Sequence, residues 1–138
     1  QQACPLWVPL VEAGELDGPG TTHFVHKYLD PLLARAQPPT RILLGCTHYP
    51  MLLPAIRAVV PRQVELLAQG ALVAESLADW ISRHDDVAAR LGTRGVRRFM
   101  TTDDPVWFAE AALRLLQGSP AVPPRGSVER VRLHEVVG

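Results

Sequence analysis

Short apolar runs alternate with helical periodicity along the middle of this chain, and this alternation restricts its fold more than any other feature. The run RILLG at residues 41–45 follows a proline break at residues 37–39 and is typical of a buried strand. A helical pattern follows Pro50, a second apolar run occupies residues 64–67, and a second helix is predicted for residues 71–83. Strands that alternate with helices in this way predict an α/β fold, with a parallel sheet in a three-layer α/β/α arrangement.

The flanking segments follow the same rules. Apolar residues at helical spacing predict a helix from Thr21 to Ala36, perturbed at Pro31. Residues 1–20 are rich in proline and glycine, and we expect them to form a loop with short extended pieces. The helix predicted for residues 71–83 should bury a face that includes Leu72, Leu77, Trp80 and Ile81.

The last third of the chain repeats the alternation. A charged surface loop at residues 85–95 precedes a predicted strand at residues 96–101. A helix is predicted for residues 105–116, with Asp103 or Asp104 as its cap and with Trp107 and Phe108 at core positions. The Pro-rich tail then ends in an alternating stretch, residues 128–133, which is typical of an edge strand.

Charge and hydropathy narrow the class of partner. Fourteen Lys and Arg residues balance fourteen Asp and Glu residues, so no net field attracts nucleic acid or an anionic membrane. No apolar run approaches the roughly 20 residues of a membrane-spanning helix, and the first residues lack the layout of a signal peptide. We therefore expect a cytoplasmic protein that binds neither nucleic acid nor a membrane.

Cys46 is the main candidate for chemistry, because it lies where the first predicted strand ends and a helix begins. Ligands of open α/β sheets gather at this end of the strands. A helix N-terminus favours the thiolate form of a cysteine and holds carboxylate ligands, to which Thr47 would add a hydroxyl donor. His48 is close enough to transfer a proton or to orient a group that does. Spacing alone leaves two alternatives open, a core cysteine and a histidine that only caps the chain.

Other candidates are weaker. Glu12 is either a solvated side chain or a partner of an active-site group, and composition favours the solvated side chain. Cys4 and Cys46 are too few for a disulfide scaffold, so we expect free thiols. Cys46 and His48 could supply two metal ligands, but no second pair has suitable spacing, so we expect no metal. The absence of a phosphate-binding glycine motif argues against a nucleotide cofactor.

Two motifs resemble a known family. The sequence LLGCTHYP at residues 43–50, preceded by ACPLWVPLVE at residues 3–12, resembles the second half of the glutamate racemases, which belong to the cofactor-independent aspartate/glutamate racemase family. The resemblance extends from Ala3 to about Gln117 and includes FMTTD at residues 99–103. It implies part of a fold with two similar α/β lobes and a site between them.

The resemblance also implies an organisation of the chain. Residues 1–69 would form the later part of the second lobe, and residues 70–118 the returning part of the first lobe. Residues 119–138 would be a Pro-rich tail that contributes an edge strand. The partner would be the N-terminal half of the enzyme, and self-association into a homodimer is left open.

The implied reaction is the interconversion of L- and D-glutamate by two thiols on opposite faces of the substrate α-carbon, without a cofactor. By resemblance Cys46 is the second of these thiols, and Thr47 and His48 belong to the substrate-binding site. His48 also takes part in acid/base chemistry, and Glu12 is the carboxylate that pairs with it. The product, D-glutamate, would supply peptidoglycan synthesis.

The chain departs from the family pattern in three places. The first catalytic cysteine of the family, in an Ala-Cys-Asn-Thr motif, and an early Asp-Ser-Gly motif are absent. Cys4 belongs to a different motif, whose cysteine is not catalytic in the family. An aspartate expected near Ala68 is also missing, which leaves the following helix without that cap.

Because the chain carries one of the two thiols, we expect that it does not racemise glutamate by itself. Two alternatives remain open. The first is a racemase for aspartate or another acidic amino acid. The second is an inactive truncated fragment that acts as an interaction module.

Overall fold

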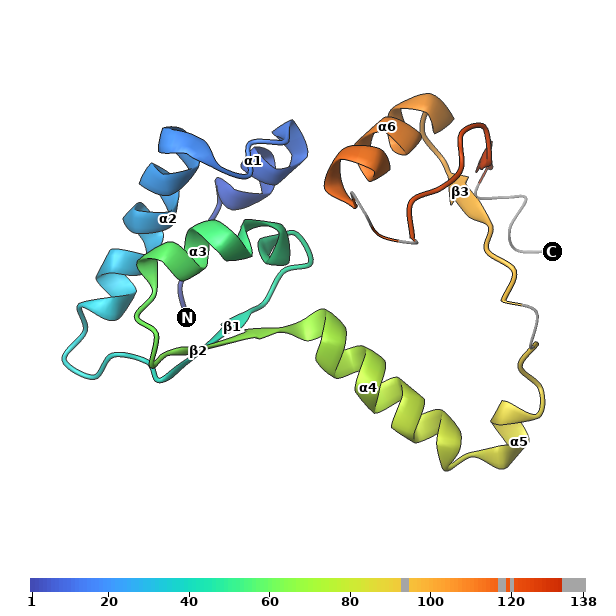
Figure 1. The fold of residues 1–138 in the computed structure, drawn as a ribbon, viewed down its shortest axis with the longest axis horizontal. Helices are drawn as coiled ribbons and strands as arrows, with labels where there is room; N and C mark the ends of the chain where they lie inside the picture. Colours follow the sequence, from blue (N-terminus) through green and yellow to red (C-terminus); the bar gives the residue numbers. More distant parts are fainter. Residues whose placement is uncertain (93–94, 117–118, 120, 133–138) are drawn as a thin grey trace. The chain divides into compact units, whose positions relative to one another are not determined.

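The computed structural model describes residues 1–92, 95–116, 119 and 121–132, and the chain divides into two compact units, Gln1–Leu91 and Gly92–Gly138 (Figure 1). The elements of the first unit are α1 (Trp7–Ala13), α2 (Gly18–Leu33), β1 (Arg41–Leu44), the 3-10 helix η1 (Tyr49–Leu52), α3 (Leu53–Val59), β2 (Glu65–Ala68), α4 (Gln69–Ser82) and α5 (Asp85–Ala88). Those of the second unit are β3 (Phe99–Thr101), α6 (Pro105–Leu115) and β4 (Val128–Arg130).

Each unit contains a pair of parallel strands. In the first unit β1 pairs with β2, so that Ile42 lies opposite Leu66 and Leu44 opposite Ala68. In the second unit β3 pairs with β4, and Phe99 lies opposite Val128. Parallel strands need a crossover connection, which α3 provides in the first unit and α6 in the second. The predicted α/β class with parallel strands is therefore present in both units.

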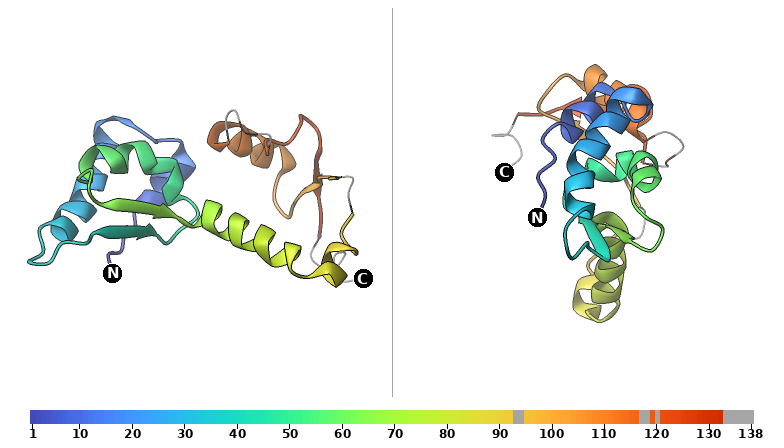
Figure 2. Two further views of the ribbon diagram at one scale, coloured as in Figure 1. Left: turned by 60° about the horizontal axis from the view of Figure 1, so that its bottom comes forward. Right: turned by 90° about the vertical axis from the view of Figure 1, so that its left-hand side faces the viewer.

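The core of the first unit lies between α1, α2, α3 and the β1–β2 pair, and Figure 2 shows these helices on one side of the strands. Burial alternates along β1, because Ile42 and Leu44 point into this core while Leu43 is exposed on the other face. The largest fully buried side chains come from the helices: Trp7, Val11, Thr21, Val25, Leu52 and Ile56.

The prediction that residues 1–20 form a loop was wrong, because Trp7–Ala13 form helix α1. Pro9 falls in the first turn of this helix, where backbone amide groups have no partner within the helix, so the proline costs no hydrogen bond. The helix ends at Ala13 and is capped by Gly14, whose φ of 79° lies in the left-handed region and whose amide donates to the carbonyl of Val11 over 2.9 Å. Glu12 therefore lies on a helix, and its position is fixed by that helix.

Helix α2 begins at Gly18, three residues before the predicted start. Pro19 occupies its first turn, which suits a residue without an amide hydrogen. Thr21 is buried and its hydroxyl donates to the carbonyl of Glu15 over 2.9 Å, which holds the preceding loop against the helix. The helix continues past Pro31 to Leu33.

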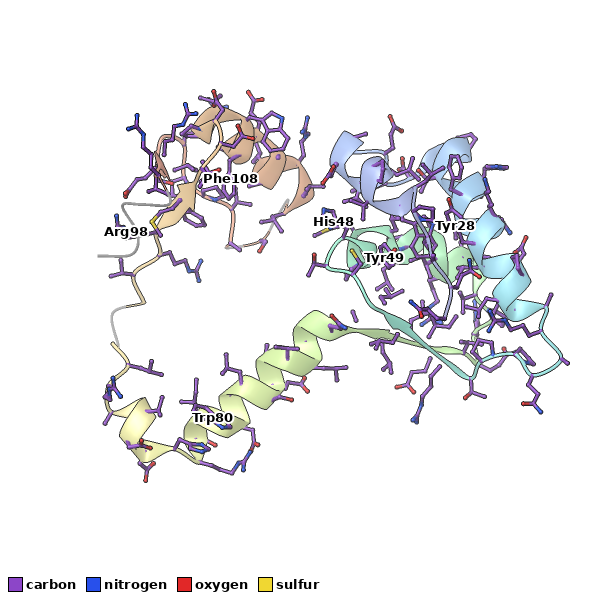
Figure 3. The ribbon with its side chains drawn as sticks, turned by 180° about the vertical axis from the view of Figure 1, so that it is seen from behind. Tyr28, His48, Tyr49, Trp80, Arg98 and Phe108 are labelled. Carbon is purple, nitrogen blue, oxygen red and sulfur yellow. The ribbon has the colours of Figure 1, made fainter. Side chains whose placement is uncertain are left out.

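Helix α4 confirms the predicted helix but not its predicted burial. Leu72, Leu77 and Trp80, expected to face the core, are all exposed, and none of the residues of α4 is buried. Figure 3 labels Trp80 on this helix. The expectation was wrong because an apolar stripe on a helix shows which side favours burial, and burial also requires an element to cover that side. As expected from the missing aspartate, no side chain caps the start of α4 at Ala68.

In the second unit the predicted cap is confirmed. Asp104 accepts hydrogen bonds from the amides of Val106 and Trp107 at 2.7 and 3.2 Å, and α6 starts at the next residue. The side chain of Trp107 is exposed, contrary to its predicted core position. The predicted edge strand corresponds to β4, and its expected end at Leu133 lies outside the described residues.

Candidate active site

The loop that follows β1 holds Cys46, Thr47 and His48. The amide of Tyr49 donates to the carbonyl of Cys46 over 3.2 Å, and the amide of Met51 donates to that of His48 over 3.0 Å. These bonds turn the chain directly into η1, a four-residue 3-10 helix with Pro50 in its first turn. The expected α-helix does not start beside Cys46 but at Leu53, so one short turn separates the thiol from α3.

The structure brings together three of the residues singled out in the sequence. The Sγ atom of Cys46 lies 3.8 Å from Nδ1 of His48, and Nε2 of His48 lies 3.5 Å from Oε1 of Glu12. Figure 3 shows His48 and Tyr49 side by side at this end of the unit. Glu12 belongs to α1, so a helix and a loop that are distant in sequence meet at the imidazole. We call this row the Cys46–His48–Glu12 relay.

The two ring nitrogens of His48 face different groups, because Nδ1 faces the Cys46 thiol and Nε2 faces the Glu12 carboxylate. A carboxylate accepts hydrogen bonds, so a His48 tautomer with its hydrogen on Nε2 would suit the contact with Glu12. In a neutral imidazole Nδ1 then has a free lone pair, and this atom faces the Cys46 thiol. In that tautomer His48 could accept a proton from Cys46, and the Glu12 carboxylate would stabilise the imidazolium that results.

Solvent exposure limits what the outer contact contributes. The side chains of His48 and Glu12 are 33% and 61% exposed, and a pair this accessible is worth at most about 1 kcal/mol. The contact therefore orients the imidazole and adds little to folding. Thr47 is also exposed, adjacent to the thiol, where a ligand can reach its hydroxyl.

Cys4 has a different environment from Cys46. It is buried, and this burial raises the pKa of its thiol from 9.0 to about 11. At neutral pH it is a protonated core residue, which agrees with its exclusion as a base. The described cysteines are both free, as predicted, and Cys46 is the more accessible of the two.

Sequence reasoning missed two aromatic residues of the site. The Tyr49 ring meets the ring of Trp7, the first residue of α1, edge to face at a centroid distance of 4.8 Å. Burial is the main reason that the pKa of Tyr49 is raised, and electrostatic repulsion from Cys4 and Cys46 adds to it. Tyr49 is therefore neutral beside the thiol at physiological pH. The only indication in the sequence that Tyr49 belongs to the site was its position directly after His48.

The buried thiol predicts a loss of stability in alkali. Between pH 9 and 11 the unfolded chain releases the Cys4 proton while the folded chain retains it, so the free energy of unfolding falls as pH rises. The full loss is about 2–3 kcal/mol. Urea unfolding under reducing conditions at pH 8 and pH 11 should show this fall, and Cys4→Ala should reduce it. An equal fall in both proteins would show that Cys4 is not its source.

Among the described residues no group of three or more His, Cys, Asp and Glu side chains is placed to hold a metal ion. In the same part of the chain no helix is both long enough and apolar enough to cross a membrane.

Comparison with known proteins identifies relatives for most of the chain, although no family model matches it. The glutamate racemase of Pseudomonas putida is 39% identical over 104 residues, which are 75% of this chain and 38% of that enzyme. The glutamate racemase of a Synechococcus species is 36% identical over 124 residues, 88% of this chain and 46% of that enzyme.

Solved structures give the same result. Glutamate racemase from Thermus thermophilus, in complex with beta-chloro-D-alanine, superposes with a TM-score of 0.73 at 36% identity, covering 97% of this chain and 48% of that one. The isoform RacE1 from Bacillus anthracis gives a TM-score of 0.77 at 28% identity, covering 96% and 46%. The chain thus spans less than half the length of the relatives it matches. It belongs to the glutamate racemases, in the aspartate/glutamate racemase family, and corresponds to one portion of them.

Proposed function

We propose that this chain is the C-terminal portion of a glutamate racemase and supplies one of the two thiols that interconvert L- and D-glutamate. The observation that carries the proposal is the Cys46–His48–Glu12 relay, which lies just after β1 in a chain that belongs to this family. Carboxyl ends of parallel strands are where α/β proteins bind ligands. A thiol there, with a histidine ready to accept its proton, suits abstraction of a proton from carbon.

The reaction needs two bases because racemisation removes a proton from one face of the α-carbon and returns one to the other. The Cys46 thiolate, formed when its proton passes to His48, would take the α-proton on its own face. The electron pair left on the α-carbon would then take a proton from a thiol on the opposite face. In the reverse direction Cys46 would donate. Thr47 and His48 would bind the substrate, and no cofactor takes part.

The second thiol would come from the portion of the enzyme that this chain does not contain. In this proposal residues 1–69 are the later part of the second lobe, residues 70–118 return to the first lobe, and residues 119–138 form the tail. The exposed apolar stripe of α4 supports this division, because a helix that returns to another lobe would bury that stripe there. The intact enzyme would work in the cytoplasm and supply D-glutamate for peptidoglycan.

The test is a chimera in which residues 1–138 replace the matching portion of the Thermus thermophilus enzyme. We expect the chimera to convert L-glutamate to D-glutamate without added cofactor and to introduce deuterium from D₂O at the α-carbon, whereas the 138-residue chain alone should show no turnover. Circular dichroism and size-exclusion chromatography establish that the chimera is folded. A folded chimera without turnover would overturn the proposal, and one that prefers L-aspartate would revise the substrate.

A further inference from the structure

The residues of the relay come from two separate elements, so other contacts must hold these elements at a fixed distance from each other. Glu12 lies on α1, whereas Cys46 and His48 lie on the loop between β1 and η1. The 3.5 Å contact between His48 and Glu12 is between exposed groups and is too weak to hold a helix against a loop. The restraint must therefore come from packing beside the relay.

Trp7 is held firmly in the core beside the relay. Its indole Nε1 donates to the carbonyl of Phe24 over 3.2 Å, and its ring meets Tyr28 of α2 edge to face at 6.2 Å. The side chain is almost fully buried. These contacts fix the first residue of α1 against α2, and Glu12 follows five residues later on the same short helix.

Tyr49 joins the loop to this anchor. Its ring lies at 80° to the Trp7 ring with the centroids 4.8 Å apart, a favourable edge-to-face geometry. The Tyr49 hydroxyl adds only a long hydrogen bond of 3.5 Å to the carbonyl of Cys4. The Tyr49 amide is bonded to the carbonyl of Cys46, and Tyr49 directly follows His48, so a movement of its ring would move both relay residues of the loop.

We propose that Tyr49 is a positioning residue, whose ring, packed on Trp7, holds His48 at the distance from Glu12 that lets the carboxylate act on the Cys46 thiol through the imidazole. This role rests on the proposed function of the relay. We assign this positioning role to the Tyr49 ring and not to its hydroxyl. The ring is in close contact with Trp7, whereas the hydroxyl contact with the carbonyl of Cys4 is at the limit of a hydrogen bond.

The test is a double-mutant cycle on the 138-residue chain, read as the alkylation rate of Cys46 by iodoacetamide at pH 7.5 and resolved from Cys4 by peptide mass mapping. The thiolate is the species that reacts, so the rate reports how well the relay accepts the thiol proton. Glu12→Gln should slow alkylation about two- to fivefold, the range of an exposed charge pair. In a Tyr49→Leu background the same change should have no measurable effect.

Tyr49→Phe is the matched control, because it keeps the ring and removes only the hydroxyl. In that background Glu12→Gln should slow alkylation as much as in the wild type. A structural role alone would lower the melting temperature of Tyr49→Leu but leave the effect of Glu12→Gln intact, and that result would overturn the proposal. Loss of the effect in Tyr49→Phe would overturn the assignment to the ring.

Two further measurements keep the proposal testable if Tyr49→Leu fails to fold. Trp7→Phe keeps an aromatic residue in the core but reduces the area in contact with the Tyr49 ring. In this background Glu12→Gln should slow the alkylation of Cys46 less than it does in the wild type. An equally large slowing would count against the proposal. In the wild-type chain, nuclear Overhauser contacts must join the two rings, and their absence would overturn it. None of these readouts needs turnover, so they can fail or succeed independently of racemisation by the chimera.

Discussion

Replacing Cys46 with serine is expected to lower racemisation by the chimera about 10²–10⁴-fold, the range that a positioned acid or base contributes. Serine keeps the size of the side chain, but its hydroxyl is far less acidic than a thiol and would not ionise beside His48. The loss should appear in both directions, because Cys46 would abstract the α-proton in one and donate it in the other. Circular dichroism assays of L- and D-glutamate at saturating substrate measure it.

Cys4→Ala is the matched control for this substitution. Cys4 is buried and its raised pKa keeps it protonated, so its loss should affect folding but leave turnover per folded molecule close to that of the unsubstituted chimera. If Cys4→Ala abolished turnover while Cys46→Ser retained it, the site would have to be moved to Cys4.

Replacing Trp7 with alanine is expected to destabilise the first unit by about 3–5 kcal/mol, the usual cost of removing a large aromatic side chain from a core. Trp7 is 2% exposed, donates a hydrogen bond to Phe24 and contacts both Tyr28 and Tyr49. Its removal would leave a cavity where α1, α2 and η1 meet. Urea unfolding followed by far-ultraviolet circular dichroism gives the change in free energy.

Trp107→Ala makes the same chemical change at an exposed position. Trp107 is 57% exposed on α6, so its replacement in the 138-residue chain should change stability by no more than about 0.5 kcal/mol. Equal costs for the two substitutions would show that the cluster around Trp7 is not the core of the first unit.

The substitutions at Trp7 and Tyr49 test two separate roles of the contact between their rings, its contribution to folding and its effect on the relay. Trp7→Ala removes the anchor and with it much of the core, so it reports on folding. Tyr49→Leu removes only the partly exposed ring at the start of η1, and so reports on the relay. The proposed positioning role predicts that the second substitution uncouples Glu12 from Cys46 at a much smaller cost in stability.

Features with local causes could be predicted from the sequence. The strand at Arg41–Leu44 follows from a short apolar run after prolines, and the Asp104 cap follows from a side chain that can reach two free amides. The placement of Cys46 at a strand end also depends only on the neighbouring residues. The sequence did not predict helix α1 because the prolines and glycines of residues 1–20 indicate a loop, although a proline in the first turn breaks no helical bond.

Only the tertiary structure decided the features that depend on distant residues. Glu12 and His48 are 36 positions apart, and although the family resemblance implied that they pair, no periodicity of either segment reveals that α1 packs beside the loop after β1. The Trp7–Tyr49 contact and the buried state of Cys4 arise from the same packing. The apolar stripe of α4 could be predicted from the sequence, but its exposure could not. The pattern shows which side of the helix favours burial, whereas burial depends on whether another element covers that side. The sequence by itself determined most of the strands and helices, since local hydrogen bonding and periodicity govern them, although it missed α1 and the short helix α5 in the predicted loop at residues 85–95. The relay required the fold, because distances between segments are set by packing.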